Sequence, residues 1–261
     1  MHQRLQIISP APILNTPDFS FAFGGPDGKT IPTNERGLPH FFEFVALKGE
    51  VFELLEICSP FIVRVSQPAY KEPNLFIDRR FTIPSEAQHT PLLPDAITIL
   101  ARMEQMVGKP YVWGGNWGRG IPALFSLYPP KGELDPHTKA LWGLAGVDCS
   151  GLLYEATDGA TPRNTSELLK FGKPLNINGL EKQQWIALLR PLDMILYKGH
   201  VLFVLDAETT IESRFPYGVI LRDLGERLDE ILSEKNYVET WDPSTDPHKQ
   251  FTIRRFVEEV V

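Results

Sequence analysis

The sequence predicts an α+β fold whose N-terminal part is entirely β. In the first 94 residues, short apolar stretches are bounded by Pro and Gly and show no helical repeat. In the rest of the chain, helical segments come first and a series of short strands follows, which is typical of an α+β domain. The proline content agrees, because 23 prolines make up about 9% of the 261 residues, against the usual ~5%, and leave few long helices.

The composition excludes several classes of protein. Apolar residues make up 43% of the chain and charged residues 23%, as in ordinary globular domains. The formal net charge is −7, and no run of Lys and Arg suggests a nucleic-acid partner. No stretch comes near the roughly 20 apolar residues that span a bilayer, and the first residues lack the apolar segment of a signal peptide. We therefore expect a cytoplasmic protein, with a periplasmic or cell-wall location by another route left open.

Short strands are expected in the N-terminal part. Apolar and acidic residues roughly alternate over 49–56, as in a half-buried strand, and further strands are expected at 61–65 and 74–78. Strands of this kind, bounded by Pro and Gly, indicate a small barrel. At the end of the first of them, Cys58 is expected to be a packed, inert thiol. The polar, Pro-containing stretch 82–94 is the expected linker.

The linker divides the chain into an N-terminal domain of residues 1–94 and a second domain of residues 95–261. The second domain opens with a helix, because Pro94 and Asp95 precede a segment with an apolar face. Helices are also expected to begin at Cys149 and at Ser166. Strands are then expected at 192–197, 201–205 and 210–213.

Cys149, His200 and Glu212 are the candidates for a nucleophile, a base and an orienting residue. The expected helix start at Cys149 favours a thiolate, because unpaired N–H groups and the helix dipole stabilise negative charge. Glu212 follows on the strand after His200, where it can fix the tautomer of the imidazole. Each residue also has a purely structural interpretation: a buried thiol, an edge histidine and a surface carboxylate. No pair of the other histidines has the spacing of metal ligands, so no metal site is expected.

A series of motifs resembles the NlpC family, papain-like cysteine peptidases that cut bacterial cell-wall peptides. The motifs occur in the family's order within residues 95–215, at 111–115, 147–152, 162–165, 191–193, 199–201 and 211–212. The resemblance implies a papain-like domain in which Cys149 is the nucleophile, His200 the general base and Glu212 the polar third residue. That third residue is often His in the family, so Glu212 departs from the pattern, although a carboxylate also orients imidazole. Tyr111 matches a tyrosine whose hydroxyl lies near the oxyanion.

A second resemblance covers about residues 10–84. Residues 47–54, 63–65 and 69–70 look like a bacterial SH3-like domain of the kind joined to NlpC domains. In relatives that trim short muropeptides, a glutamate and a tyrosine of the barrel and the two residues flanking the catalytic cysteine hold the free amine of an N-terminal L-alanine. The matching residues are Glu50, Tyr70, Asp148 and Ser150. The structural alternative for the first two is an exposed acidic residue in a strand and a packed aromatic ring.

Together the resemblances imply a cysteine endopeptidase that needs no cofactor. Its expected substrate is a peptidoglycan stem peptide, cut between γ-D-glutamate and meso-diaminopimelate or lysine, and most simply a short recycled fragment with a free N-terminal L-alanine. Two alternatives stay open: a catalytically idle protein that binds stem peptides, and an amidase or acyltransferase on the same fold. The segment 116–147 is longer than usual for the family, and is either a structural insertion or part of the cleft wall.

Overall fold

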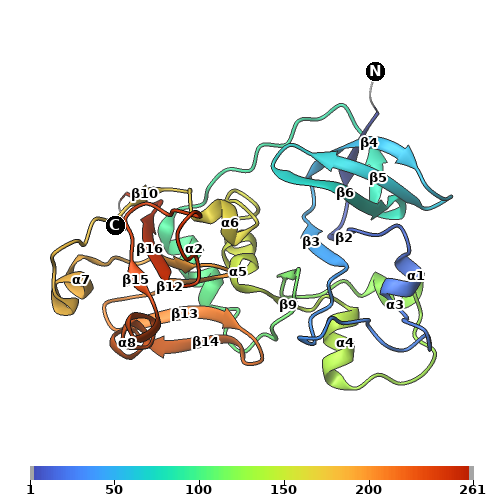
Figure 1. Ribbon diagram of the computed structural model, residues 1–261. Helices are drawn as coiled ribbons and strands as arrows, with labels where there is room; N and C mark the ends of the chain where they lie inside the picture. The colour runs from blue at the N-terminus through green and yellow to red at the C-terminus, as the bar shows by residue number, and fades with distance from the viewer. Residues whose placement is uncertain (1–2, 259–261) are drawn as a thin grey trace. The chain divides into compact units, whose positions relative to one another are not determined.

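The computed structural model describes residues 3–258 and has a mixed α/β architecture (Figure 1). The chain forms two compact units that interleave in sequence. The first comprises Met1–Pro91 and Lys109–Gly151, and the second comprises Leu92–Gly108 and Leu152–Val261. These units do not follow a single cut at residue 94, because 109–151 packs with the N-terminal strands. Within residues 3–258, no helix combines the length and the apolar character that crossing a membrane requires.

The first unit is built on a seven-stranded antiparallel sheet with the order β3-β2-β6-β5-β4-β1-β7. Its strands are β1 (Arg4–Ile7), β2 (Ala11–Leu14), β3 (Phe42–Ala46), β4 (Val51–Ile57), β5 (Ile62–Gln67), β6 (Tyr70–Asp78) and β7 (Thr82–Pro84). The strands expected at 49–56, 61–65 and 74–78 correspond to β4, β5 and β6. The expected linker 82–94 begins with β7, which pairs with β1.

The sheet of the first unit forms an open path rather than the closed barrel expected from the sequence. Strands β1 and β2 pair with opposite edges of the meander β4-β5-β6, β1 with β4 and β2 with β6. Among the described residues, however, the pairings end at β3 and β7, so they do not show an SH3-like barrel. Short alternating strands have the same local pattern in an open sheet and in a barrel. Closure depends on the pairing of strands that lie far apart in the sequence.

Cys58 is exposed, which corrects the expectation of a packed thiol. It follows the last residue of β4 and lies in the turn to β5, where its backbone N–H donates to the carbonyl of Ile62 at 3.0 Å. A side chain in a hairpin turn has no neighbouring strand to cover it. The turn therefore accounts for the exposure of this thiol.

Residues 109–151 supply part of the core of the first unit. Trp142 is fully buried in one apolar cluster with residues of the N-terminal sheet, and the Tyr128 ring stacks on Phe23 at a centroid distance of 5.2 Å. The Tyr128 hydroxyl also donates to the fully buried Asp78 at 2.6 Å. The segment 116–147 is thus a structural part of this unit. The remaining elements here are α1 (Phe19–Ala22), the 3-10 helix η1 (Arg79–Phe81), β8 (Asn116–Trp117), α3 (Ala123–Leu127), α4 (Pro136–Trp142) and β9 (Gly146–Val147).

The second unit contains a second sheet, with the order β10-β16-β11-β12-β13-β14 and with β15 parallel to β16. Its strands are β10 (Lys173–Pro174), β11 (Met194–Tyr197), β12 (His200–Val204), β13 (Thr209–Arg214), β14 (Gly218–Asp223), β15 (Asn236–Tyr237) and β16 (Gln250–Arg255). Its helices are α2 (Ala96–Glu104), α6 (Thr165–Leu168), α7 (Lys182–Leu188) and α8 (Leu224–Glu234). Helix α5 (Cys149–Ala156) begins in the first unit and continues in the second.

The helices and strands expected in the second unit correspond to α2, α5, α6, β11, β12 and β13. Its other elements are additional: α7, α8, β10, β14, β15 and β16. Helix α8 lies beside β13 and β14 (Figure 1). Its apolar residues Leu224, Leu228 and Ile231 join the core formed by β11, β12 and β16. This packing gives α8 a fixed face toward the sheet that carries His200 and Glu212.

Candidate active site

Cys149 is the first residue of α5 and is buried. The preceding residue, Asp148, caps the helix, because its Oδ1 accepts from the N–H of Gly151 at 2.7 Å. The same oxygen accepts from the hydroxyl of Ser150 at 3.2 Å. The helix start predicted at Cys149 is thus confirmed, and the structure adds the cap by Asp148.

Two of the motifs meet at this helix start. The N–H of Asp148 donates to the carbonyl of Gly115 at 2.9 Å, and the N–H of Gly114 donates to Oδ2 of Asp148 at 3.1 Å. A Cβ on Gly151 would lie 2.0 Å from that same Gly115 carbonyl oxygen, so only glycine permits this approach. Tyr111, half-buried, lies in a parallel bridge with Val147. The backbone around Cys149 is therefore held on both sides.

Glu50 and Tyr70 are both buried in the first unit. Glu50 precedes β4 and accepts from the N–H of Leu47 and from the amide of Gln67, each at 3.0 Å. Tyr70 begins β6, and its hydroxyl donates to the carboxylate of Glu43 at 2.7 Å. Glu50 is thus not the exposed strand residue of the structural alternative. Glu43 was not singled out from the sequence, since nothing local marks it as the partner of a tyrosine on another strand.

His200 and Glu212 lie together in the second unit. His200 begins β12 after the two-residue turn from β11, and Glu212 lies on the neighbouring β13. The Nε2 atom of His200 lies 2.6 Å from Oε2 of Glu212, which is fully buried. A carboxylate at this distance makes a charge-assisted hydrogen bond when the imidazole is protonated. The predicted proximity of the two residues is observed.

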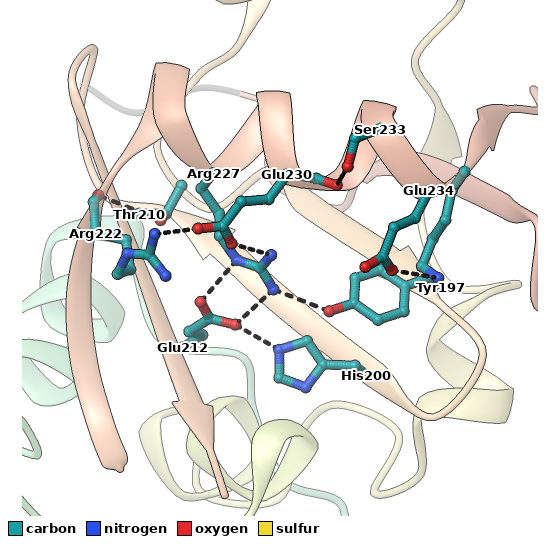
Figure 2. Close-up of polar contacts among 10 residues, drawn as sticks. Tyr197, His200, Thr210, Glu212, Arg222, Arg227, Glu230, Ser233 and Glu234 are labelled. Carbon is teal, nitrogen blue, oxygen red and sulfur yellow. Dashed lines mark hydrogen bonds and ion pairs between the residues drawn. The ribbon is translucent and has the colours of Figure 1, made fainter.

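Arg227 completes the surroundings of Glu212 (Figure 2). Its Nε donates to Oε1 of Glu212 at 2.8 Å and its Nη2 donates to Oε2 at 3.1 Å. The same Nη2 donates to the hydroxyl of Tyr197 at 2.9 Å. Arg227 is buried, so the guanidinium and the carboxylate form a bidentate ion pair inside the unit.

These contacts set the ionisation of Glu212. Burial by itself raises the pKa of a carboxyl, but the hydrogen bonds from His200 and Arg227 outweigh burial and lower the pKa of Glu212 to about 2. For Arg227, burial acts to lower the pKa, yet the bonds to Glu212 and the neighbouring Tyr197 raise it above the ordinary value. Glu212 is therefore an anion and Arg227 a cation at neutral pH.

Arg227 was not singled out from the sequence, although a signal was present. Within 224–234, the apolar positions that face the core recur at helical spacing, and Arg227 lies on the same face between Leu224 and Leu228. A charged residue on the apolar face of an amphipathic helix requires a buried partner of opposite charge. Neither the pattern nor the spacing identifies that partner as Glu212, which comes from a different element.

The motif at 191–193 has a structural role. Asp193 is buried, and its carboxylate accepts from Arg255 at 2.6 and 2.7 Å and from the N–H of Arg190 at 2.9 Å. These bonds attach the start of β11 to β16. Among residues 3–258, there is also no group of three or more His, Cys, Asp or Glu side chains that could hold a metal ion.

The solved structures that are similar to this chain include NlpC/P60 proteins. An NlpC/P60 family protein from Bacillus cereus is 17% identical with a TM-score of 0.36, over 98% of this chain and 63% of the other. NlpC2 from Trichomonas vaginalis is 13% identical with a TM-score of 0.35, over 98% and 73% of the two chains. RipD from Mycobacterium tuberculosis, described as a non-catalytic NlpC/p60 domain protein adapted to peptidoglycan binding, is 20% identical with a TM-score of 0.35, over 62% and 97%.

This chain therefore spans less than two thirds of the length of the Bacillus cereus protein. No protein-family model and no curated protein matches the chain.

Proposed function

We propose that this protein is a cysteine peptidase that hydrolyses the bond between γ-D-glutamate and the diamino acid of short peptidoglycan stem peptides. The observation that carries the proposal is the bond of 2.6 Å between His200 and Glu212. It joins the two residues that the motif order assigns as base and orienting residue. Cys149, the assigned nucleophile, is buried at the start of a helix that Asp148 caps.

In the proposed reaction, the Cys149 thiolate attacks the γ-carbonyl carbon of D-glutamate and forms a tetrahedral intermediate. Protonated His200 then donates its proton to the leaving amine as the C–N bond breaks, which leaves a thioester on Cys149. Neutral His200 next takes a proton from water, and the resulting hydroxide displaces the thiolate. Since Nε2 of His200 bonds Glu212, we assign these proton transfers to Nδ1.

The oxyanion of the intermediate requires donors aimed at the carbonyl oxygen. We assign this role to the backbone N–H of Cys149 and the hydroxyl of Tyr111, as the resemblance implies. The bonds between the segments that carry these two residues support the assignment, because they fix the local backbone.

We further propose that a free N-terminal amine of the substrate is recognised by Glu50, Tyr70, Asp148 and Ser150. A buried ammonium needs carboxylate partners, and both carboxylates of this group are buried. The hydroxyls of Tyr70 and Ser150 each donate to a carboxylate, and a hydroxyl oxygen can also accept a hydrogen bond.

The test is mass spectrometry of L-Ala-γ-D-Glu-meso-diaminopimelate after incubation with the protein. The wild type should release diaminopimelate, and Cys149→Ala should lower the rate by about 10⁴-fold or more. Cys58→Ala is the matched control and should retain the rate, because Cys58 is the other cysteine and lies exposed in a turn. The same peptide with an acetylated N-terminus should be cut poorly, and the lysine peptide measures the preference for the diamino acid.

The outcomes separate the parts of the proposal. Equal cleavage of the free and acetylated peptides would remove the amine-binding role of Glu50 and Tyr70 and leave the peptidase. Cleavage of neither peptide, with Cys149 alkylated more slowly than Cys58 near neutral pH, would overturn the peptidase and favour a protein that binds stem peptides.

A further inference from the structure

The buried guanidinium of Arg227 bonds the carboxylate of Glu212, which in turn bonds His200. Arg227 holds both oxygens of Glu212, at 2.8 and 3.1 Å, and His200 bonds one of those oxygens at 2.6 Å. Figure 2 shows the guanidinium of Arg227 on one side of the carboxylate and the imidazole of His200 on the other. Glu212 therefore has a single orientation in which one oxygen meets the imidazole.

Arg227 is itself fixed. Its Nη2 donates to the Tyr197 hydroxyl at 2.9 Å, and its Nη1 donates to the Glu230 carboxylate at 3.0 Å. Helix α8, which carries Arg227, is anchored in the core by its apolar face. A guanidinium held by several partners on a packed helix can position a carboxylate with little freedom.

The charge of Arg227 has a second effect. A fully buried carboxylate that faced the imidazole alone would strongly stabilise the imidazolium and make His200 a poor acid. A cation within hydrogen-bond distance of the same carboxylate cancels most of that field. The combined charge of Glu212 and Arg227 is then close to zero.

We propose that Arg227 is a positioning residue for His200, because it fixes both oxygens of Glu212 and balances their charge. His200 thus bonds a carboxylate oxygen of fixed orientation, and the combined charge of Glu212 and Arg227 is close to zero. The inference rests on the proposed function, in which His200 both gives and takes a proton. The other titratable or charged groups in this network are Tyr197 of β11, Arg214 of β13, Arg222 of β14, Glu230 of α8 and Lys235 after α8.

The test is an NMR titration of His200, assigned with His200→Gln and carried out in a Cys149→Ala background so that no thiolate contributes. Glu212→Gln removes the anion and leaves the cation, so the pKa of His200 should fall by about one unit or more. Arg227→Met removes the cation and leaves the anion, so the pKa should rise by about one unit. The double variant is neutral, and its pKa should return to within about half a unit of the reference.

Two further variants serve as controls. Arg222→Met removes a cation that bonds Glu230 at 2.5 Å and not Glu212, and it should leave the pKa of His200 nearly unchanged. Arg227→Lys keeps the charge and should also keep the pKa within about half a unit of the reference. Should Arg227→Met fail to fold, the double variant compared with Glu212→Gln carries the same test, since it leaves no unpaired buried charge.

Shifts of the same sign in the two single variants, or no shift in either, would overturn the inference, because a merely structural arginine changes stability and not the sign of a titration shift. The titration needs no turnover, so its failure is distinct from a failure of the proposed function. Opposed shifts in a protein that cleaves no stem peptide would keep the positioning role and remove the peptidase. Cleavage of stem peptides without opposed pKa shifts of His200 would keep the peptidase and remove the positioning role of Arg227.

Discussion

At the scale of single residues, Glu212 shows how a buried carboxylate stays ionised. It has no exposed surface, and its oxygens are bonded by one imidazole and one guanidinium. Burial raises its pKa, but the two partners more than offset burial. Neither partner is adjacent to it in the sequence.

This ionisation predicts a pH dependence of stability. The pKa of Glu212 is about 2 in the folded protein, below its value of about 4.5 in an unfolded chain. A depressed pKa contributes stability above the unfolded value, and that stability is lost as the pH falls from about 4.5 toward 2. The contribution near neutral pH is on the order of 3 kcal/mol. Urea unfolding followed by tryptophan fluorescence should show Glu212→Gln to be less stable than the wild type at pH 7, with a gap that narrows as the pH falls to about 3.

The exposed Glu72→Gln is the matched control for this prediction and should show little difference from the wild type at any pH. A gap between Glu212→Gln and the wild type that stays constant from pH 7 to about 3 would contradict it.

At the scale of elements, the side chain of Asn116 makes the backbone hydrogen bonds that a neighbouring strand would make with β3. The amide of Asn116, at the start of β8, accepts from the N–H of Val45 and donates to its carbonyl, both at 2.8 Å. Asn116 therefore binds β3 much as a neighbouring strand would. This contact and the core position of Trp142 both attach 109–151 to the N-terminal sheet.

The C-terminal end of α4, where Leu141 and Trp142 are buried, gives a prediction at this scale. Trp142 has no exposed surface, and its indole N–H donates to the carbonyl of Tyr128 at 2.9 Å. Trp142→Ala should lower the free energy of unfolding by about 3–5 kcal/mol, because it opens a large cavity and loses that bond. Leu55→Ala, at a position 44% exposed on β4, should cost much less. Equal losses in denaturant unfolding would mean that α4 is not part of the core.

At the scale of the whole molecule, the two units share the chain in alternating segments. Residues 109–151 belong with the N-terminal strands, whereas 92–108 belong with the C-terminal half. Consequently an N-terminal fragment that ends at residue 94 lacks part of its own core.

This arrangement predicts the behaviour of fragments. Residues 1–94 alone should show no cooperative unfolding and should bind a hydrophobic dye, because the apolar surface that packs against Leu141 and Trp142 in the whole protein is then open to water. Co-expression with residues 95–261 should restore a cooperative transition. A stable, cooperatively folded 1–94 fragment would show instead that the N-terminal sheet is independent of 109–151.

Much of the second unit and part of the site follow from local pattern. The turn before β12 and the spacing to β13 predict that His200 and Glu212 meet, because adjacent antiparallel strands have a restricted register. The cap on α5 likewise follows from an aspartate before the helix. The exposure of Cys58 and the open pairing of the first sheet do not follow from local pattern. Both depend on how strands that are far apart in the sequence pack and pair.

The sequence by itself determined the α+β class, the helix start at Cys149 and the pairing of His200 with Glu212, because each depends on residues that are close along the chain or on neighbouring strands. Only the tertiary structure decided that Arg227 bonds both oxygens of Glu212 and that Tyr70 bonds Glu43. It also decided that 109–151 completes the core of the first unit. These contacts join separate elements. The side chains that meet there are selected by packing, and packing is a property of the whole fold.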